Sequence, residues 1–204
     1  NHLGGDEIRM PNVSTVSGIR FLRWSLVVLL VSLSAMAGAS LADENDARRV
    51  DISLSIFPRI VAVDNHFRDK LNSDKKAYLL FIYDDNKEYA QQLADRMKNS
   101  NANIGGMAVV TKIMSVADDL PINDLPTALF VVERLNDAQL EKIMGFADGA
   151  HRLVFSPYSG DVERGVTVGI SVTNRVKPYF NLSALRQSKV TINALLMKMS
   201  KRHE

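Results

Sequence analysis

Tyr78-Leu79-Leu80-Phe81-Ile82-Tyr83, followed by Asp84-Asp85-Asn86, is the stretch that decides the fold. Six consecutive apolar residues predict a strand that is buried on both faces, as in a parallel sheet. The polar triplet after the strand predicts a helix start, because Asp and Asn side chains accept hydrogen bonds from the first amides of a helix. Residues 89–97 then place apolar side chains at helical spacing, which predicts a helix packed with one face on the sheet.

Three further apolar runs, at residues 107–113, 127–132 and 153–155, predict the other strands of this sheet. Asn136 and Asp137 can cap a helix between the last two runs. Strands that alternate with helices in this order are expected to pair in parallel through crossover connections. The sequence therefore predicts an α/β fold, a three-layer sandwich whose mostly parallel sheet has about four strands.

Both ends of the folded part differ from this pattern. Residues 47–63 predict a helix with a kink or break at Pro58, because proline lacks the amide donor that a helix requires. Residues 166–172 and 176–180 are separated by three residues and predict a C-terminal antiparallel hairpin. Two short helices close the predicted fold. Asn181 is expected to cap the first of them and Thr191 the second.

The first part of the chain has the pattern of a secretory signal peptide. Residues 1–9 precede the first methionine and are interpreted as a cloning remnant or an extended gene start. Residues 10–42 contain a short basic region, an apolar core and small residues, which predicts a leader cut after Ala42, or alternatively after Ala39. An uncleaved membrane anchor is the competing interpretation, because residues 24–42 carry no charge.

Removal of the leader leaves residues 43–204, a length that suits a single domain. Three basic and two acidic residues precede the cut, so 22 Lys and Arg and 21 Asp and Glu remain of the 25 and 23 in the chain. No basic stripe is present, which argues against a nucleic-acid partner. The sequence contains no cysteine, so disulfides, thiolate nucleophiles and zinc-thiolate sites are excluded.

Carboxylates follow two of the predicted strands. Asp84 and Asp85 come directly after the first strand, and Glu133 follows the third. Ligands of doubly wound sheets bind at the carboxyl ends of strands, and three carboxylates there could hold a divalent cation or another ligand. Acidic residues after a strand are also common helix caps, and this interpretation is favoured.

The loop of residues 156–165 concentrates proline, glycine, an aromatic ring and charges between the last parallel strand and the hairpin. Such a composition predicts a shaped loop, and Tyr and Arg are residue types that contribute strongly to recognition surfaces. We expect a partner to contact Tyr158, Asp161, Glu163 and Arg164. The alternative is a turn that only redirects the chain.

The C-terminal part of the chain contains four phrases in a fixed order: Arg152-Leu153-Val154-Phe155-Ser156-Pro157, residues 165–172, Val176-Lys177-Pro178-Tyr179-Phe180-Asn181-Leu182, and Leu195-Leu196-Met197-Lys198-Met199-Ser200-Lys201. In these phrases and in the order of its elements, the chain resembles the YfiR-like family of bacterial periplasmic proteins. The resemblance implies a periplasmic α/β domain that binds the outward-facing part of an inner-membrane diguanylate cyclase and restrains it. Release of that restraint raises cyclic di-GMP.

Two features depart from the family pattern. Better-known relatives carry paired cysteines, which this chain lacks, so redox gating does not transfer. The first helix has Phe57-Pro58-Arg59 where the family commonly has a Trp-Pro ending, which puts a partner surface on that helix in doubt.

The functional prediction is a non-enzymatic periplasmic regulator that requires no cofactor or metal. Its expected partner is an inner-membrane diguanylate cyclase or sensor kinase; we expect no membrane insertion after leader cleavage, and homo-oligomers are possible. The alternative is a small periplasmic solute-binding protein with its ligand near Asp84 and Asp85. A third interpretation is a metal-dependent hydrolase that uses Asp84, Asp85 and Glu133.

Overall fold

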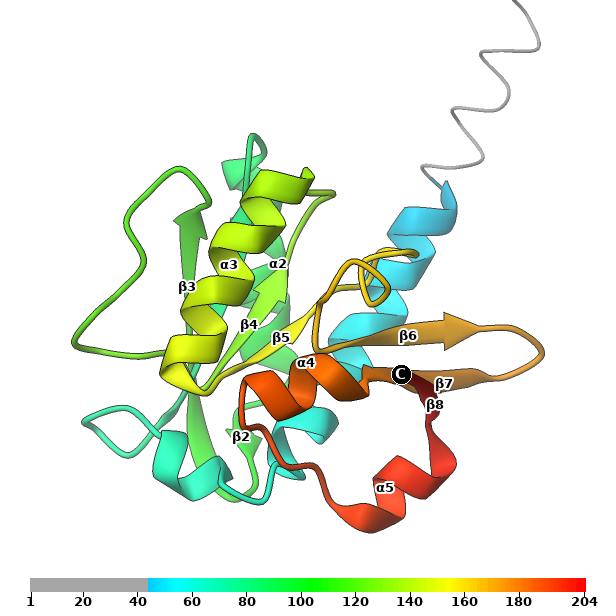
Figure 1. Ribbon diagram of the computed structural model, residues 1–204. Coiled ribbons are helices and arrows are strands. Elements are labelled where there is room, and N and C mark those ends of the chain that lie inside the picture. The colour runs from blue at the N-terminus through cyan, green and yellow to red at the C-terminus, as the bar shows by residue number, and fades with distance from the viewer. Residues whose placement is uncertain (1–43) are drawn as a thin grey trace, which may run out of the picture. The chain divides into compact units, whose positions relative to one another are not determined.

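The computed structural model describes residues 44–204, so the predicted leader (residues 10–42) and residues 1–9 lie outside the described part. Within it, the strands form one eight-stranded sheet in the order β2-β3-β1-β4-β5-β6-β7-β8 (Figure 1). The strands are β1 (Ala77–Tyr83), β2 (Asn103–Ile104), β3 (Met107–Ser115), β4 (Ala128–Val131), β5 (Leu153–Phe155), β6 (Val168–Val172), β7 (Val176–Asn181) and β8 (Lys201–His203). The helices are residues 44–62, the 3-10 helix Phe67–Lys70, α2 (Lys87–Ser100), α3 (Asp137–Ala150), α4 (Leu182–Gln187) and α5 (Ala194–Met199).

The α/β class and the mixed sheet agree with the sequence prediction. Strands β3, β1, β4, β5 and β6 are mutually parallel, and β6 and β7 form the expected antiparallel hairpin. The sheet is larger than the four strands expected, because β6 joins the parallel part and two short strands extend its edges. Strands β2 and β8 contain only two and three residues. Strands of this length are too short to be recognised from alternating apolar and polar residues.

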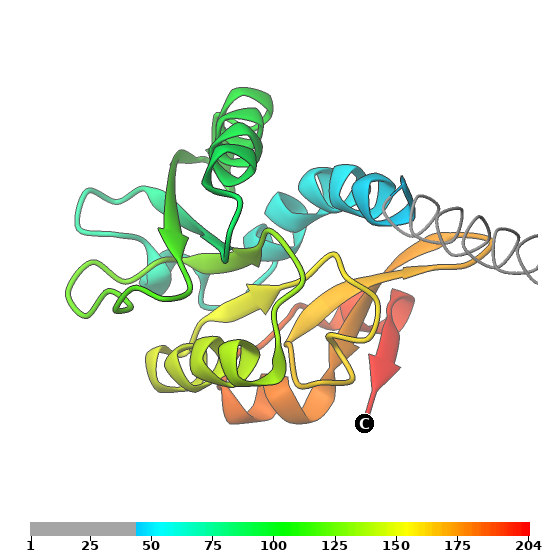
Figure 2. The ribbon, with the colours of Figure 1, turned by 90° about the horizontal axis from the view of Figure 1, so that it is seen from above.

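Helices cover both faces of the sheet. Figure 2 shows the helix of residues 44–62 and α2 on one side, with α3 and α4 on the other. Residues Asn45–Glu204 form one compact unit.

A row of phenylalanines lies on the sheet face below the first helix. Phe81, Phe130 and Phe155 are neighbours in register on β1, β4 and β5. Phe57 of the first helix packs on two of them, with ring centroids 5.3 Å from Phe130 and 5.4 Å from Phe155. All four rings are fully buried, so this layer joins the first helix to the centre of the sheet.

The break expected at Pro58 is wrong, because the helix continues through it to residue 62. Pro58 follows Phe57, whose packing on the sheet stabilises the helix where one backbone hydrogen bond is missing. The packing of the helix on the sheet therefore outweighs the tendency of Pro58 to break it.

Two of the named helix caps were predicted correctly. Asn136 caps α3 in a reciprocal capping box with Gln139, and Asn181 caps α4. The helix start after β1 was also correct, but its N-cap is Asn86 and not Asp84 or Asp85. Thr191 was wrong as the last cap, since Asn193 accepts the hydrogen bond at the start of α5.

Candidate functional site

The loop of residues 156–165 closes on a buried carboxylate. Asp161 is only 1% exposed. Its two oxygens accept hydrogen bonds from the Ser156 hydroxyl at 2.6 Å and from Nη1 of Arg164 at 2.9 Å. The backbone of Asp161 also accepts from the amide of Val166. These bonds tie the beginning of the loop to its end.

Glycines allow this loop to turn and to lie close to the sheet. Gly160 and Gly165 have φ angles of +94° and +107°, which L side chains rarely adopt. Gly169 of β6 lies under the loop, where an added Cβ would come within 2.8 Å of the Ser156 carbonyl and 2.9 Å of Val162. The unusual dihedrals expected in the loop are therefore present, and its close approach depends on a glycine outside it.

Tyr158 points into the protein and does not form part of the loop surface. Its hydroxyl donates to the Val132 carbonyl after β4, and the ring is 6% exposed. The Arg134 guanidinium lies 5.2 Å from the ring centroid. Burial raises the pKa of Tyr158 above its ordinary value, so the phenol stays neutral as a donor.

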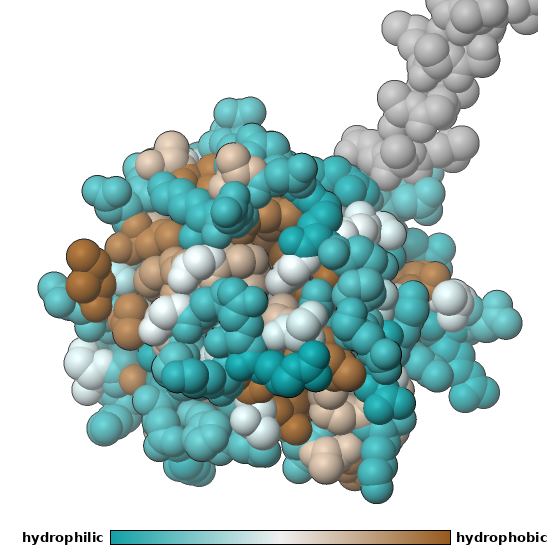
Figure 3. All heavy atoms as spheres, viewed as in Figure 1, coloured by the Kyte–Doolittle hydropathy of each residue, from teal (hydrophilic) through white to brown (hydrophobic). Residues whose placement is uncertain are grey.

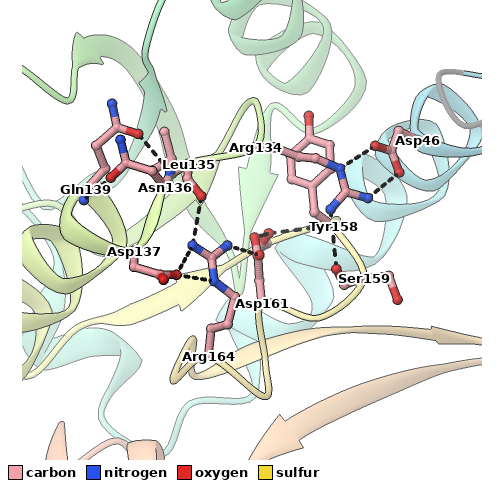
Figure 4. A network of polar contacts seen from close by, with 11 residues as sticks. Asp46, Arg134, Leu135, Asn136, Asp137, Gln139, Tyr158, Ser159, Asp161 and Arg164 are labelled. Atoms are coloured by element: carbon pink, nitrogen blue, oxygen red, sulfur yellow. Dashed lines mark hydrogen bonds and ion pairs between the residues drawn. The ribbon is translucent and has the colours of Figure 1, made fainter. Parts of the chain in front are cut away.

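Three arginines fix the loop: Arg49 and Arg134 come from other elements and Arg164 from the loop itself, and Figure 4 shows the contacts of Arg134 and Arg164. Arg134 binds Asp46 of the first helix through Nε and Nη2, at 2.7 and 3.0 Å, and donates to the Ser159 carbonyl. The hydrogen bonds to Asp46 raise the pKa of Arg134, against the effect of burial. Its position between the helix and the loop joins these two segments directly.

Arg49 forms the second link between the first helix and the loop. Its Nε donates to the Pro157 carbonyl at 2.6 Å, and Nη2 donates to the Ile170 carbonyl of β6 at 2.8 Å. Burial lowers the pKa of Arg49, while the Asp46 carboxylate opposes that shift. One side chain thus connects the helix, the loop and the hairpin.

Arg164 forms the third link, at the start of α3. Besides Asp161, it binds the Asp137 carboxylate at 2.6 Å and the Leu135 carbonyl at 3.0 Å. The side chain of Asp137 is 94% exposed, so that ion pair contributes little, whereas the pair with the buried Asp161 is shielded from water.

Of the four residues predicted to contact a partner, Tyr158 and Asp161 are buried in the structure. Their polar atoms bind groups inside the domain. Exposed side chains in the loop are Ser159, Glu163 and Arg164. Glu163 lies near Tyr179 of β7, whose pKa is raised by burial and then by this carboxylate.

At the strand ends, the Glu133 side chain binds the backbone that carries Asp84 and Asp85. The sheet order changes direction between β1 and β4, which is where doubly wound folds bind ligands. Here Oε1 of Glu133 accepts from the backbone amides of Asp84, Asp85 and Asn86, at 2.8, 3.1 and 3.0 Å. The protein's own carboxylate therefore occupies the anion position at the start of α2.

Within residues 44–204, no group of three His, Cys, Asp or Glu side chains is placed to hold a metal ion. The metal-dependent arrangement of Asp84, Asp85 and Glu133 is accordingly wrong, because Glu133 faces the backbone amides. In the same range, no helix has the length and apolarity needed to cross a bilayer.

Surface hollows lie elsewhere. A cavity of about 600 Å³ lies between α3 and α4 and is lined by acidic and small residues, among them Glu141, Gly145 and Asp148. A hollow of about 390 Å³ separates the first helix from the hairpin, between Arg48 and Val172. Neither is lined by the strand-end carboxylates.

Fold and site together define an α/β domain with a mostly parallel sheet and a loop held by arginine side chains. No protein family matches the sequence, and no curated protein matches it. Solved structures that align with part of this chain include a conserved domain protein from Vibrio cholerae O1 biovar El Tor, at 15% identity and a TM-score of 0.45 over 63% of this chain and 55% of that one. Another is the ABC domain from Streptococcus pneumonia in complex with L-Trp, at 11% identity and a TM-score of 0.44 over 70% of this chain and 61% of that one. The chain covers less than two thirds of either structure.

Sequence reasoning identified the loop but missed what fixes it. Arg49 lies 108 residues before its acceptor Pro157, and Asp46 lies 88 residues before Arg134. No local pattern marks such long-range pairs. A weak signal existed for Gly169, since a glycine inside a strand indicates a close approach of another backbone.

Proposed function

We propose that this chain is a non-enzymatic periplasmic regulator of the YfiR-like type. It binds an inner-membrane signalling protein, a diguanylate cyclase, and restrains it, so that cyclic di-GMP rises when the restraint is released. The resemblance in sequence motivates the proposal. The observation that carries it is the loop of residues 156–165, which presents exposed polar groups on a scaffold fixed from three sides.

Rigidity of this loop matters for binding. A flexible loop loses conformational entropy when it binds, at about 0.5–1.5 kcal/mol for each side chain that becomes ordered. Here Arg49, Arg134 and Arg164 have already ordered the backbone, and Ser159 and Glu163 remain exposed to a partner. A surface of this kind can distinguish two conformations of a partner, and a regulator acts through that difference in affinity.

The loop is also joined to the first helix through Asp46 and Arg49. That helix follows the predicted leader within a few residues. A force or a contact at the start of the helix would therefore reach the loop through two direct links. Such a connection gives the regulator a physical route by which a contact on the first helix alters the loop surface.

Cyclic di-GMP measurements in cells test this function. We expect loss of the gene to raise the nucleotide level, and Ser159→Arg or Glu163→Lys to reproduce that rise at normal protein abundance. Ser73→Arg is the matched control, because Ser73 is also an exposed serine but precedes β1 at the other end of the strands. An unchanged nucleotide level after gene loss would refute the proposal.

A further inference from the structure

The last sixteen residues carry the net charge of the folded domain. Residues 45–188 contain 18 Lys and Arg and 18 Asp and Glu, so they are neutral. Residues 189–204 contain four basic residues, Lys189, Lys198, Lys201 and Arg202, against the single carboxylate side chain of Glu204. All four basic residues are exposed or largely so, and none forms an ion pair with a carboxylate in the described part of the chain.

Two large apolar side chains project from the same segment. Leu195 is 68% exposed and Met199 is 64% exposed, and the intervening Lys198 lies on the same face of α5. Leu196 and Met197 turn inward and pack against the core. In Figure 3, apolar surface is visible beside hydrophilic surface at the lower edge of the molecule, where Figure 1 places α5.

The segment is fixed in position. Asp64 and Ile192 form an isolated β-bridge, and the amide of Asn193 donates to the Val63 carbonyl. Ile192 is buried, and β8 pairs with β7 beyond the helix. The exposure of Leu195 and Met199 is therefore a feature of the folded domain and not of a loose chain end.

We propose that α5 and the basic residues around it form a docking surface for a bilayer that contains anionic phospholipids. Leu195 and Met199 enter the interface between headgroups and acyl chains, and Lys198 between them binds lipid phosphate, while the positive charge of the C-terminal segment attracts the anionic surface. This function is independent of the loop of residues 156–165. It orients the domain on a membrane.

Charge and shape favour this occupant over a second copy of the chain. A symmetric contact through α5 would place the Lys198 side chains of two copies next to each other, with no carboxylate beside them to compensate. The exposed side chains of this short helix project from the surface and do not form a groove that could receive a protein partner. A bilayer surface needs no such frame, because lipids rearrange around a projecting side chain.

The absence of native cysteine allows a direct test in the full chain. Met199→Cys carries an environment-sensitive fluorophore, and Ile122→Cys is the matched control because Ile122 is an exposed apolar residue, 86% accessible, in the loop between β3 and β4. Vesicles of phosphatidylcholine alone are compared with vesicles that contain about one third phosphatidylglycerol.

With anionic vesicles, we expect a blue shift at position 199 and quenching of that probe by brominated lipid, with neither at position 122. Lys198→Glu in the Met199→Cys background should weaken the lipid dependence of the shift by about tenfold, and raising the salt from about 0.1 to about 0.5 M should have a similar effect. Contact made only through the leader would leave both probes in water.

Three results would overturn the proposal: no shift at position 199 on anionic vesicles, an equal shift on neutral vesicles, or equal shifts at both positions. A shift without vesicles that grows with protein concentration would assign α5 to contact between copies. If Lys198→Glu removes capture of a membrane protein but leaves vesicle binding unchanged, the surface serves a protein partner.

Discussion

Arg49→Met tests whether the arginine contacts stabilise the loop in the folded domain. Methionine retains an unbranched apolar stem but removes the donors to the Pro157 and Ile170 carbonyls. Both acceptors are then left without the guanidinium, which was their link to the first helix. The change acts on the connection between segments and leaves the core below it intact.

The expected cost follows from these two hydrogen bonds. A hydrogen bond from a charged donor contributes about 1.5–3 kcal/mol, and two on one side chain are not fully additive. Water can reach part of this half-buried site, so we expect the free energy of unfolding to fall by about 2–4 kcal/mol. Arg48→Met is the control: Arg48 is the exposed neighbour on the same helix, and its replacement should change stability by less than about 0.5 kcal/mol.

Urea unfolding monitored by circular dichroism measures the difference, provided that the m-values of the two variants agree. Amide hydrogen exchange shows which segment is destabilised. Residues 156–165 should exchange faster in Arg49→Met, while the amides of β1 stay protected. Equal unfolding free energies for Arg49→Met and Arg48→Met would refute the view that this arginine fixes the loop.

Three further outcomes are expected. Gly169→Ala should destabilise the domain by about 1–3 kcal/mol in urea unfolding, because the new methyl group meets the Ser156 carbonyl, while Gly145→Ala on α3, which has open space, should not destabilise it. Glu133→Ala should cost about 1–3 kcal/mol and Glu133→Gln less, since the amide oxygen can still accept from the Asp84–Asn86 backbone; equal losses would contradict the acceptor role. Burial, followed by the Asp124 carboxylate, raises the pKa of Tyr78 to about 12, above its ordinary value. Stability from neutral Tyr78 should therefore be complete below about pH 10 and decline as pH rises toward 12, and an ultraviolet titration should lose a phase near pH 12 in Tyr78→Phe.

The sequence was sufficient for the α/β class and for the central strands, because each is a continuous apolar run with a polar boundary. It was also sufficient for the hairpin and for the caps Asn136 and Asn181, whose side chains act within three residues of their own position. The two edge strands were not accessible, nor was the unbroken course of the predicted first helix at Pro58, since both depend on pairing and packing with distant residues.

The candidate site divides in the same way. The loop could be recognised from its proline and glycines, yet the direction in which Tyr158 and Asp161 point could not. Their burial follows from acceptors and donors on other elements, such as the Val132 carbonyl. The carboxylates at the strand ends were interpreted mainly as helix caps, and Glu133 accepts from backbone amides before α2, although no local pattern connects it with that helix.

Site-directed crosslinking in cells tests the central claim most directly. Ser159→Cys changes one exposed side chain in a chain without cysteine, so a short photoactivatable crosslinker attached there reports only on the loop. We predict a single major adduct with an integral membrane signalling protein, which Ser73→Cys with the same crosslinker does not form. An adduct pattern that is the same for both positions, or no membrane protein at Ser159→Cys, would contradict the proposed role of the loop.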